Sequence, residues 1–552
     1  MRQTHPCAST FKYCGSAELQ PLPLQHRFDF GTVSRLDQDT SVALAAIREW
    51  RNSFIPINRF PPEVLSLIPI LLPREADVIR ASAVCRRWRR TFTQHAALWS
   101  KLTLTQERGD LFVKTWLDRA KSSALDITSF GFNDVSTLAL LSSRTQQLRA
   151  LSLVDTCWSD IERFAEAAAH PLPNLQSLTI HVTGFNPLDP ETSSRPLCPL
   201  FESAVNLSNF ALRAEGLAHL DHFVFPNLTT FELLTLPEGT FAEEPAFPTL
   251  QLLEFLESTP TLQTIHLAIL VRTSLEAVPS GRIVVLPNVK QFRAAEQEPG
   301  HKIAAHISCP FAKHICLACE EESDDPRPQE AFAPSSAWCA VPLQFMAYRV
   351  DEVVLELEAF QDVSCSISFL SPGSSTFQMS YSINSVEKSS SPRPTLQREY
   401  AEVFTQASKF IQSHPLLTKI RRLRVGDRHV LLSPNQLKRV ANDIERLFKS
   451  LGPLDELTLD VSDLRPYFAP FIDPPKSHRM RQSFTYPKIA HLTVGDRSRG
   501  FSGGASMVGI VEFAMSLHSL GVPLERVVLQ ARVPLVEVAE RLRLWVGEVQ
   551  CQ

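Results

Sequence analysis

Apolar residues between positions 56 and 102 are spaced for short helices, and they outnumber what so small a segment can bury. Pro61 and Pro62 suit the first turn of a helix, and Glu63 adds negative charge near the positive end of its dipole. Pro73 is expected to end this helix. Two apolar stripes run along it about 100° apart, one of Val64, Leu67 and Leu71 and one of Leu65, Ile68 and Leu72. The segment lacks the mass to cover both stripes, so the second stripe needs cover from elsewhere.

Two shorter helices are predicted after this one. The first runs through Asp77 and Ala81, and the second runs from Val84 to Phe92. Val84, Trp88 and Phe92 recur at i, i+4 and i+8, which predicts one buried face on the second helix. Four arginines between them are expected to form a solvated face: Arg86, Arg87, Arg89 and Arg90.

These residues resemble the F-box, a three-helix motif that recruits the Skp-type adaptor of cullin-RING ubiquitin ligases. The resemblance rests on four stretches: Phe60-Pro61-Pro62-Glu63-Val64-Leu65, Ser66 to Leu72, Val84-Cys85-Arg86-Arg87-Trp88-Arg89, and Leu98-Trp99. Phe60 stands where the family more often has leucine. The resemblance implies that the adaptor contacts Phe60, Pro61, Pro62, Glu63, Val64, Leu65, Ile68, Leu72, Val84, Cys85, Trp88, Leu98 and Trp99. Which of them face inward and which face the partner stays open at this point.

A different pattern takes over after the F-box-like segment: apolar, two residues, apolar, one residue, apolar. It occurs at Leu148, Leu151, Leu153; Leu175, Leu178, Ile180; Leu207, Phe210, Leu212; Leu228, Phe231, Leu233; Leu262, Ile265, Leu267; Ile420, Leu423, Val425; Leu454, Leu457, Leu459; Ile489, Leu492, Val494; and Leu524, Val527, Leu529. Pro-Asn precedes some copies, as at Pro173-Asn174 and Pro226-Asn227. Each copy predicts a strand, preceded by a turn in which an asparagine side chain hydrogen-bonds the local backbone.

The repeated strands predict a curved, mostly parallel sheet, because their spacing of about 21 to 35 residues leaves room for a return segment in each repeat. The pattern is similar to irregular leucine-rich-repeat solenoids, although the asparagine that follows the strand in strict repeats is largely missing. Val353, Leu355 and Leu357 alternate as a further strand, so the array is expected to continue through looser sequence.

The chain of 552 residues therefore divides into four predicted parts. They are a disordered tail at 1–40, a leading helix at 41–55, the F-box at 56–105, and the repeat array at 106–552 with insertions near 294–394. Within the leading helix, Ser41 to Arg51 resembles what precedes the F-box in the expanded F-box families of mushroom-forming fungi. The expected fold class is α+β or α/β.

Composition and charge limit which cellular compartment and which partners are expected for the chain. A net charge of −4 without a basic stripe argues against nucleic acid, and no apolar run reaches the roughly 20 residues of a membrane span. The N-terminus lacks the apolar core of a signal peptide. Eleven cysteines without framework spacing indicate reduced thiols. We expect a cytoplasmic or nuclear protein.

Two groups of residues invite a chemical interpretation. Cys309, His314, Cys316 and Cys319 are close enough to suggest zinc, but buried cysteine in a repeat core is the commoner arrangement. Gly500 to Gly504 has the letters of a nucleophile elbow around Ser502, yet no strand leads directly into it. Walker A, dinucleotide-binding and HExxH motifs are absent from the sequence. We expect no metal, no cofactor and no enzymatic activity.

Two functions remain as hypotheses, with a hydrolase as a distant third. In the first, the chain is the substrate-receptor subunit of an SCF-type ligase, with the Skp-type adaptor, the cullin bound through it, and a target protein of unknown identity as partners. In the second, the chain is a scaffold whose N-terminal helices only cap the repeats. A spare apolar stripe favours the first, because a cap should present a polar outer face.

Overall fold

The computed structural model resolves two compact units, Met1–Leu98 and Trp99–Gln552, which are described separately. It describes residues 30–71, 75–105, 107–131, 135–167, 171–183, 204–215, 225–236, 247–270, 273–274, 278–279, 281–296, 303–321, 352–359, 363–370, 376–383, 393–413, 420–428, 434–461, 464, 467–468, 488–495, 504–530 and 536–551.

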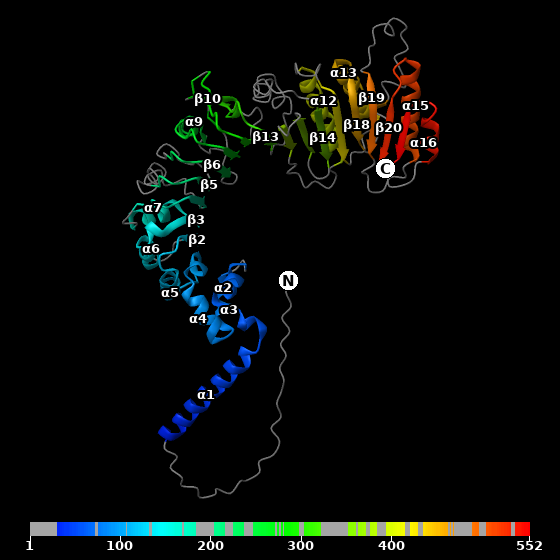
Figure 1. Cartoon of the computed structure of the whole chain (residues 1–552). Helices are drawn as coiled ribbons and strands as arrows, with labels where there is room; N and C mark the ends of the chain where they lie inside the picture. Colours follow the sequence, from blue (N-terminus) through cyan, green and yellow to red (C-terminus); the bar gives the residue numbers. More distant parts are fainter. Residues whose placement is uncertain are drawn as a thin grey trace, which may run out of the picture. The chain divides into compact units, whose positions relative to one another are not determined.

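The first unit is helical (Figure 1). Its elements are α1 (Phe30–Ser53), η1 (Pro56–Arg59), α2 (Pro62–Ile70), α3 (Glu75–Ala83) and α4 (Arg86–Gln94), and η2 (Ala96–Trp99) runs to the start of the second unit. Helices α2, α3 and α4 pack against one another, which confirms the expected three-helix motif.

Helix α1 is longer than the sequence predicted. It begins at Phe30, so residues 30–40 are helical and the predicted boundary between tail and helix is wrong. Almost all of its described side chains are exposed, and a helix without a buried face leaves no burial pattern that marks its start. The remainder of the predicted tail, residues 1–29, lies outside the described residues.

The second unit is built on one 17-stranded sheet. In spatial order its strands are β1 (Lys101–Leu104), β2 (Leu125–Phe130), β3 (Leu148–Thr156), β4 (Ser177–Val182), β5 (Asn209–Glu215), β6 (Thr230–Leu236), β8 (Thr264–Ile269), β11 (Gln291–Glu296), β13 (His314–Glu321), β16 (Thr376–Ile383), β15 (Val363–Leu370), β14 (Glu352–Ala359), β17 (Arg422–Arg428), β18 (Leu454–Asp460), β19 (Ile489–Gly495), β20 (Arg526–Gln530) and β21 (Glu548–Cys551). Two short parallel pairs lie beside it, β7 (Phe247–Pro248) with β9 (Thr273–Ser274) and β10 (Val284–Val285) with β12 (Ile307–Ser308). The sheet is open and curves along the stack of strands (Figure 1).

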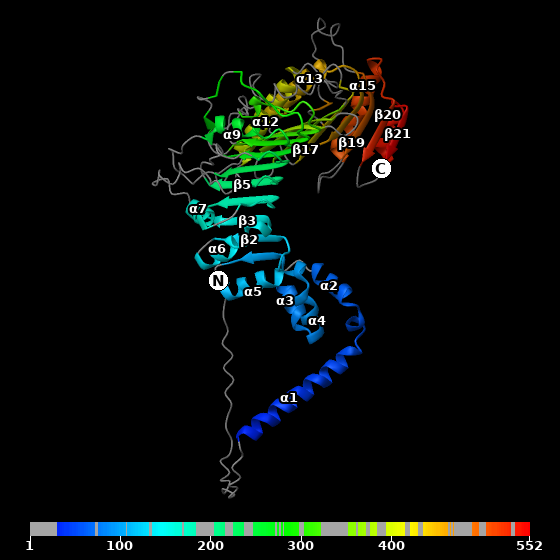
Figure 2. The same cartoon turned by 60° about the vertical axis from the view of Figure 1, so that its left-hand side comes forward.

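Helices line one face of this sheet (Figure 2). They are α5 (Asp110–Ala120), α6 (Val135–Ser142), α7 (Trp158–Ala167), α9 (Thr249–Glu257), α12 (Arg393–Ser413), α13 (Pro434–Ser450), α15 (Gly504–Ser519) and α16 (Val536–Leu542), with the short turns η3 (Thr145–Gln147) and η4 (Ala304–His306). No described helix has both the length and the apolar character that crossing a membrane requires.

The predicted strand pattern is confirmed. Every residue of the nine apolar triplets is buried, and each triplet marks one strand of the sheet or the turn residue just before it. The parallel register aligns the second position of successive triplets, so that Leu178 pairs with Phe210 and Phe210 pairs with Phe231. Phe255 of α9 packs on Phe231 with ring centroids 4.7 Å apart. The core is thus a continuous apolar row beneath the helices.

The region near 294–394 contains a reversal rather than a simple insertion. Strand β15 is antiparallel to both of its neighbours, β14 and β16, while β16 continues the parallel ladder from β13 and β14 continues it into β17. Among the described strands, β15 is the only one that runs against the others. The alternation at Val353 and Leu355 belongs to β14, so the predicted strand is present and continues the sheet into β17.

Asparagines at the turns have a different role from the one expected. The sequence predicted a bond to the local backbone, whereas four asparagine side chains, and that of Thr261 at an equivalent turn, donate to a carbonyl of the preceding repeat. The bonds are Asn174 to Gln146 at 2.7 Å, Asn206 to Pro173 at 2.6 Å, Asn227 to Val205 at 2.8 Å, Thr261 to Pro226 at 3.0 Å and Asn288 to Pro260 at 2.9 Å. We call these five residues the turn ladder; they connect six successive turns.

Candidate functional site

One face of α2 is apolar and open to solvent. Phe60, Val64, Leu67 and Leu71, which we call the α2 stripe, are all exposed, and Leu71 is 82% exposed. Their spacing keeps Val64, Leu67 and Leu71 on one side of the helix, while Phe60 lies just before it in extended backbone. This is the first of the two stripes predicted from the sequence, extended by Phe60.

The opposite face of α2 packs inside the unit. Leu65 is 0% exposed, Ser66 is buried and Ile68 is half-buried. Leu65 was expected to contact the adaptor, and that assignment is wrong because its side chain has no accessible surface. The sequence left the second stripe for a partner to cover, and that prediction is wrong, because its described members face the core. Its third member, Leu72, lies outside the described residues.

Pro61, Pro62 and Glu63 are exposed at the start of α2. Pro62 and Glu63 occupy the first turn, where proline sacrifices no helical hydrogen bond and the carboxylate lies near the free N–H groups. They remain accessible beside the α2 stripe.

A buried polar network holds this segment against α4. The Trp88 indole N–H donates to the Asn58 side-chain oxygen over 2.6 Å, and the Asn58 amide donates to the backbone oxygen of Asn52 over 2.8 Å. Arg87 donates to the backbone oxygens of both Asn58 and Phe60. Trp88 was expected to contact the adaptor, but its side chain is buried. Arg87 was expected on a solvated face, but it hydrogen-bonds the backbone of the segment before α2. Arg87 thereby positions Phe60.

Val84 is 58% exposed, so the predicted inward face of Val84, Trp88 and Phe92 holds only for the last two. The reason is local: Cys85 is extended at φ −156° and caps α4, so Val84 lies before the helix and does not share its periodicity. Cys85 is half-buried. Val84 stays available to a partner.

Leu98 and Trp99 do not form an exposed anchor. Both are buried, and Trp99 begins the second unit. Its ring packs edge-on against Trp116 of α5 at 4.7 Å, and the Arg119 guanidinium lies 4.4 Å from its centroid. The adaptor role implied for these two residues is therefore wrong, because their surfaces are already covered within the chain.

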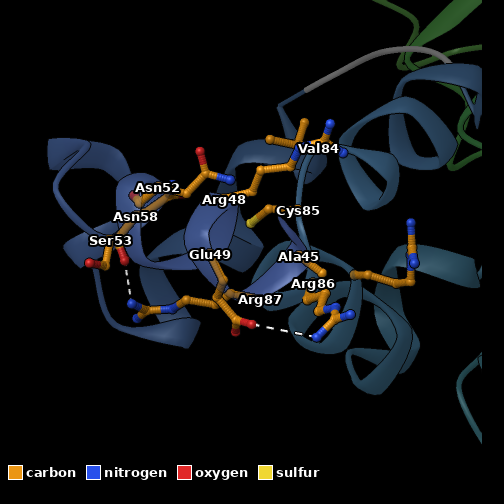
Figure 3. A pocket seen from close by; sticks show the side chains of 11 residues that line it. Ala45, Arg48, Glu49, Asn52, Ser53, Asn58, Val84, Cys85, Arg86 and Arg87 are labelled. Atoms are coloured by element: carbon orange, nitrogen blue, oxygen red, sulfur yellow. Dashed lines mark hydrogen bonds and ion pairs between the residues drawn. The ribbon is translucent and has the colours of Figure 1, made fainter. Parts of the chain in front are cut away.

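A polar pocket of about 340 Å³ separates α1 from the start of α4 (Figure 3). Residues of α1 that line it include Ala45, Glu49 and Asn52, and across from them lie Val84 to Arg87. Glu49 and Arg86 form an ion pair at 3.7 Å, visible in Figure 3. The polar side of α1 thus faces the F-box-like helices.

The cysteine cluster does not converge on one point. On β13 the side chain of Cys319 is buried on the core face of the sheet, whereas His314 and Cys316 lie on the opposite face. There the His314 ring forms a hydrogen bond with the Thr376 hydroxyl at 2.8 Å. Cys309 is buried, and burial raises the pKa of its thiol to about 12. This geometry is that of core cysteines, and Ser502 lies outside the described residues. Within those residues no set of three metal-binding side chains comes together.

The open face of the sheet carries charges of both signs. Arg149 pairs with Asp126 at 2.6 Å, and Arg213 pairs with Glu232 at 2.9 Å, each across two adjacent strands. Further along, Arg424 lies 3.6 Å from Asp460. Alternation of side chains puts these residues opposite the apolar row, so a polar surface is offered by strands far apart in the sequence.

Comparison with known proteins adds one family. No curated protein gives a significant match to the chain. Residues 57–105 match the family model described as F-box-like. This range starts in η1 and ends after β1, so it contains α2, α3 and α4 with the exposed stripe. The chain is an F-box domain-containing protein.

Proposed function

We propose that the chain is the substrate-receptor subunit of an SCF-type cullin-RING ubiquitin ligase. Its F-box would bind the Skp-type adaptor and, through it, the cullin. The observation that carries this proposal is the α2 stripe: three apolar side chains on one helix face and Phe60 just before it, all four exposed in the described part of the chain. Full burial of each aliphatic member would contribute about 1.5 to 3 kcal/mol, enough to leave a net affinity after the costs of association.

The second unit would hold the target protein, as an irregular leucine-rich-repeat-like array. Its open face carries accessible ion pairs across β2 and β3 and across β5 and β6, which suits a polar protein surface. In this proposal the chain catalyses nothing itself. It raises the effective concentration of the target near the transferred ubiquitin.

A reducing compartment, cytoplasmic or nuclear, is the location we propose. Cys85, Cys157, Cys316 and Cys551, which are at least partly accessible, are all free thiols, as are the buried Cys309, Cys319 and Cys365. Disulfides persist mainly in oxidising compartments, so this pattern is typical of a reducing one.

The second candidate is a scaffold whose N-terminal helices only cap the repeats. The α2 stripe argues against it, since a cap needs a polar outer face. Trp99 and Trp116, moreover, already form an aromatic layer at the start of the second unit. The two candidates differ in whether the adaptor binds.

The test is co-expression of the full chain with the Skp-type adaptor, followed by size-exclusion chromatography. We expect a one-to-one complex that is lost in a Leu67→Asp and Leu71→Asp double variant, because both side chains are exposed and their replacement leaves the core intact. Leu111→Asp, at a 79% exposed position of α5, is the matched control and should leave the complex unchanged. If the adaptor elutes separately from a folded chain, the substrate-receptor hypothesis is wrong and the scaffold hypothesis replaces it.

A further inference from the structure

Helix α1 presents a second apolar face that nothing in the described chain covers. Val33, Leu36, Ile47, Trp50 and Phe54 are exposed, and Trp50 is 66% exposed. Thr40 and Ala43 fill the gap between Leu36 and Ile47, and the whole series is then spaced by alternating steps of three and four residues. This is the spacing of a coiled-coil seam. We call this series the α1 stripe: Val33, Leu36, Thr40, Ala43, Ile47, Trp50 and Phe54.

The other side of α1 is the one that meets the F-box. Ala45 and Asn52 are the half-buried positions among its described side chains, and both line the pocket in Figure 3. Glu49 on the same side pairs with Arg86. At about 100° per residue these positions lie roughly opposite the α1 stripe. A helix normally buries its apolar side, so the reversed arrangement requires an external cover for the stripe.

Charge and side-chain size point to a second copy of the same helix in antiparallel orientation. Opposing two stripes head to tail sets Trp50 of one copy against Thr40 of the other and Ile47 against Ala43, so that large residues meet small ones. It also brings Asp37 beside Arg51 of the second copy, twice by symmetry. A parallel pair would instead oppose Trp50 with Trp50 and leave Asp37 and Arg51 without a complementary charge.

We propose that the chain forms a homodimer through antiparallel pairing of the α1 stripe. A two-fold contact of this kind uses the same patch on both chains, which is the commonest symmetry of homo-oligomers. The helix of 24 residues provides about 36 Å of contact length. The dimer would carry two F-boxes and two sheets. It is independent of the proposed ligase function, since no adaptor takes part in it.

The test measures the mass of the purified full chain by analytical ultracentrifugation over a wide concentration range, without adaptor. We expect a reversible species of twice the 61.8 kDa of one chain. An Ile47→Glu and Trp50→Glu double variant should weaken association by at least about a hundredfold, since both residues are central in the stripe. Val42→Glu, at a 61% exposed position of α1 away from the stripe, should not change it.

Charge reversal tests the orientation. Asp37→Arg and Arg51→Asp should each weaken association, and the two together should restore it, because the antiparallel pair is then rebuilt with opposite signs. Unchanged thermal unfolding in all variants would confirm that the fold is intact. Failure of the double reversal to restore association would overturn the antiparallel arrangement.

Other occupants of the stripe give distinct results. A chain that stays monomeric at every concentration overturns the proposal. If that monomer sediments with phosphatidylcholine–phosphatidylserine vesicles and the Ile47→Glu and Trp50→Glu variant does not, the stripe is a lipid-binding face. If that variant instead loses the adaptor complex, the adaptor covers the stripe.

Discussion

Asn58 connects three segments of the first unit through one side chain. It is buried, accepts a hydrogen bond from the Trp88 indole and donates one to the backbone of Asn52. Buried polar groups are costly when unpaired, so a satisfied amide in this position selects one arrangement of α1, η1 and α4.

Replacing Asn58 with alanine should therefore destabilise the F-box. The Trp88 N–H would be left buried without an acceptor, and we expect a loss of about 1 to 3 kcal/mol. The measurement is hydrogen exchange of peptides from α3 and α4 in the full chain. Asn52→Ala is the control: its contribution is a backbone oxygen, which alanine keeps, so protection should change by less than about 0.5 kcal/mol.

Cys309 provides a prediction about pH. Burial raises the pKa of its thiol to about 12, because a thiolate is poorly solvated in the core. The pKa of an unfolded cysteine is about 8.5, so the neutral thiol contributes its full stabilising effect below that pH. This contribution falls as pH rises from about 8.5 toward 12, by at most about 1.4 kcal/mol per pH unit.

Urea unfolding of the wild type and of Cys309→Val across this pH range measures the effect. We expect stability to fall less steeply in the variant at high pH. In the folded wild type, iodoacetamide should modify the exposed Cys551 and spare Cys309 and the buried Cys365. Rapid native labelling of Cys309 would show that the thiol is not in the core.

At the scale of the element, α2 divides its leucines between two roles. Leu65 lies in the core with 0% exposure, whereas Leu67 lies on the α2 stripe. Leu65→Ala should lower the unfolding free energy of the F-box by about 2 to 5 kcal/mol, because it removes buried volume. Leu67→Ala should change it by less than about 0.5 kcal/mol.

Both alanine variants should be followed by hydrogen exchange of the F-box peptides, and their adaptor affinity measured separately. Leu67→Ala is expected to weaken the adaptor complex with an unchanged fold. Equal destabilisation by the two variants would mean that the α2 stripe is packed within the chain, contrary to the assignment above.

At the scale of the whole molecule, the turn ladder connects repeats that are otherwise joined by the sheet and its core. Each member donates to the turn of the preceding repeat, so its effect should be confined to neighbours. We expect Asn206→Ala with Asn227→Ala to increase hydrogen exchange in β4, β5 and β6 and to leave β18 to β20 unchanged.

Ser208→Ala is a useful comparison for this prediction, since its hydroxyl lies near the same turns and is bonded to Gln176 at 3.0 Å. A smaller change than in the double asparagine variant would assign the effect to the ladder. An increase spread evenly over all strands would contradict the nearest-neighbour picture.

Local patterns of residues were enough to predict the element types and the general architecture. Apolar triplets whose last two members alternate identified nine strands, because one face of each strand enters a core, and helical spacing with proline at the start located α2. The same local patterns carried the resemblance to the F-box, which the family match at residues 57–105 supports. All of these signals lie within a few residues of one another.

Which surfaces are left open depends on how the helices and strands pack together. Leu65 and Leu67 are chemically identical, so their burial depends on what packs against each side of α2. Other features also depend on residues far apart in the sequence: the reversal of β15, the hydrogen bonds of Arg87 and the bonds of the turn ladder. Most of these pairs are at least 12 positions apart, so no local pattern of residues predicts them. The exposed side of α1 was equally undetermined, because an amphipathic pattern predicts two faces but does not say which one the chain covers.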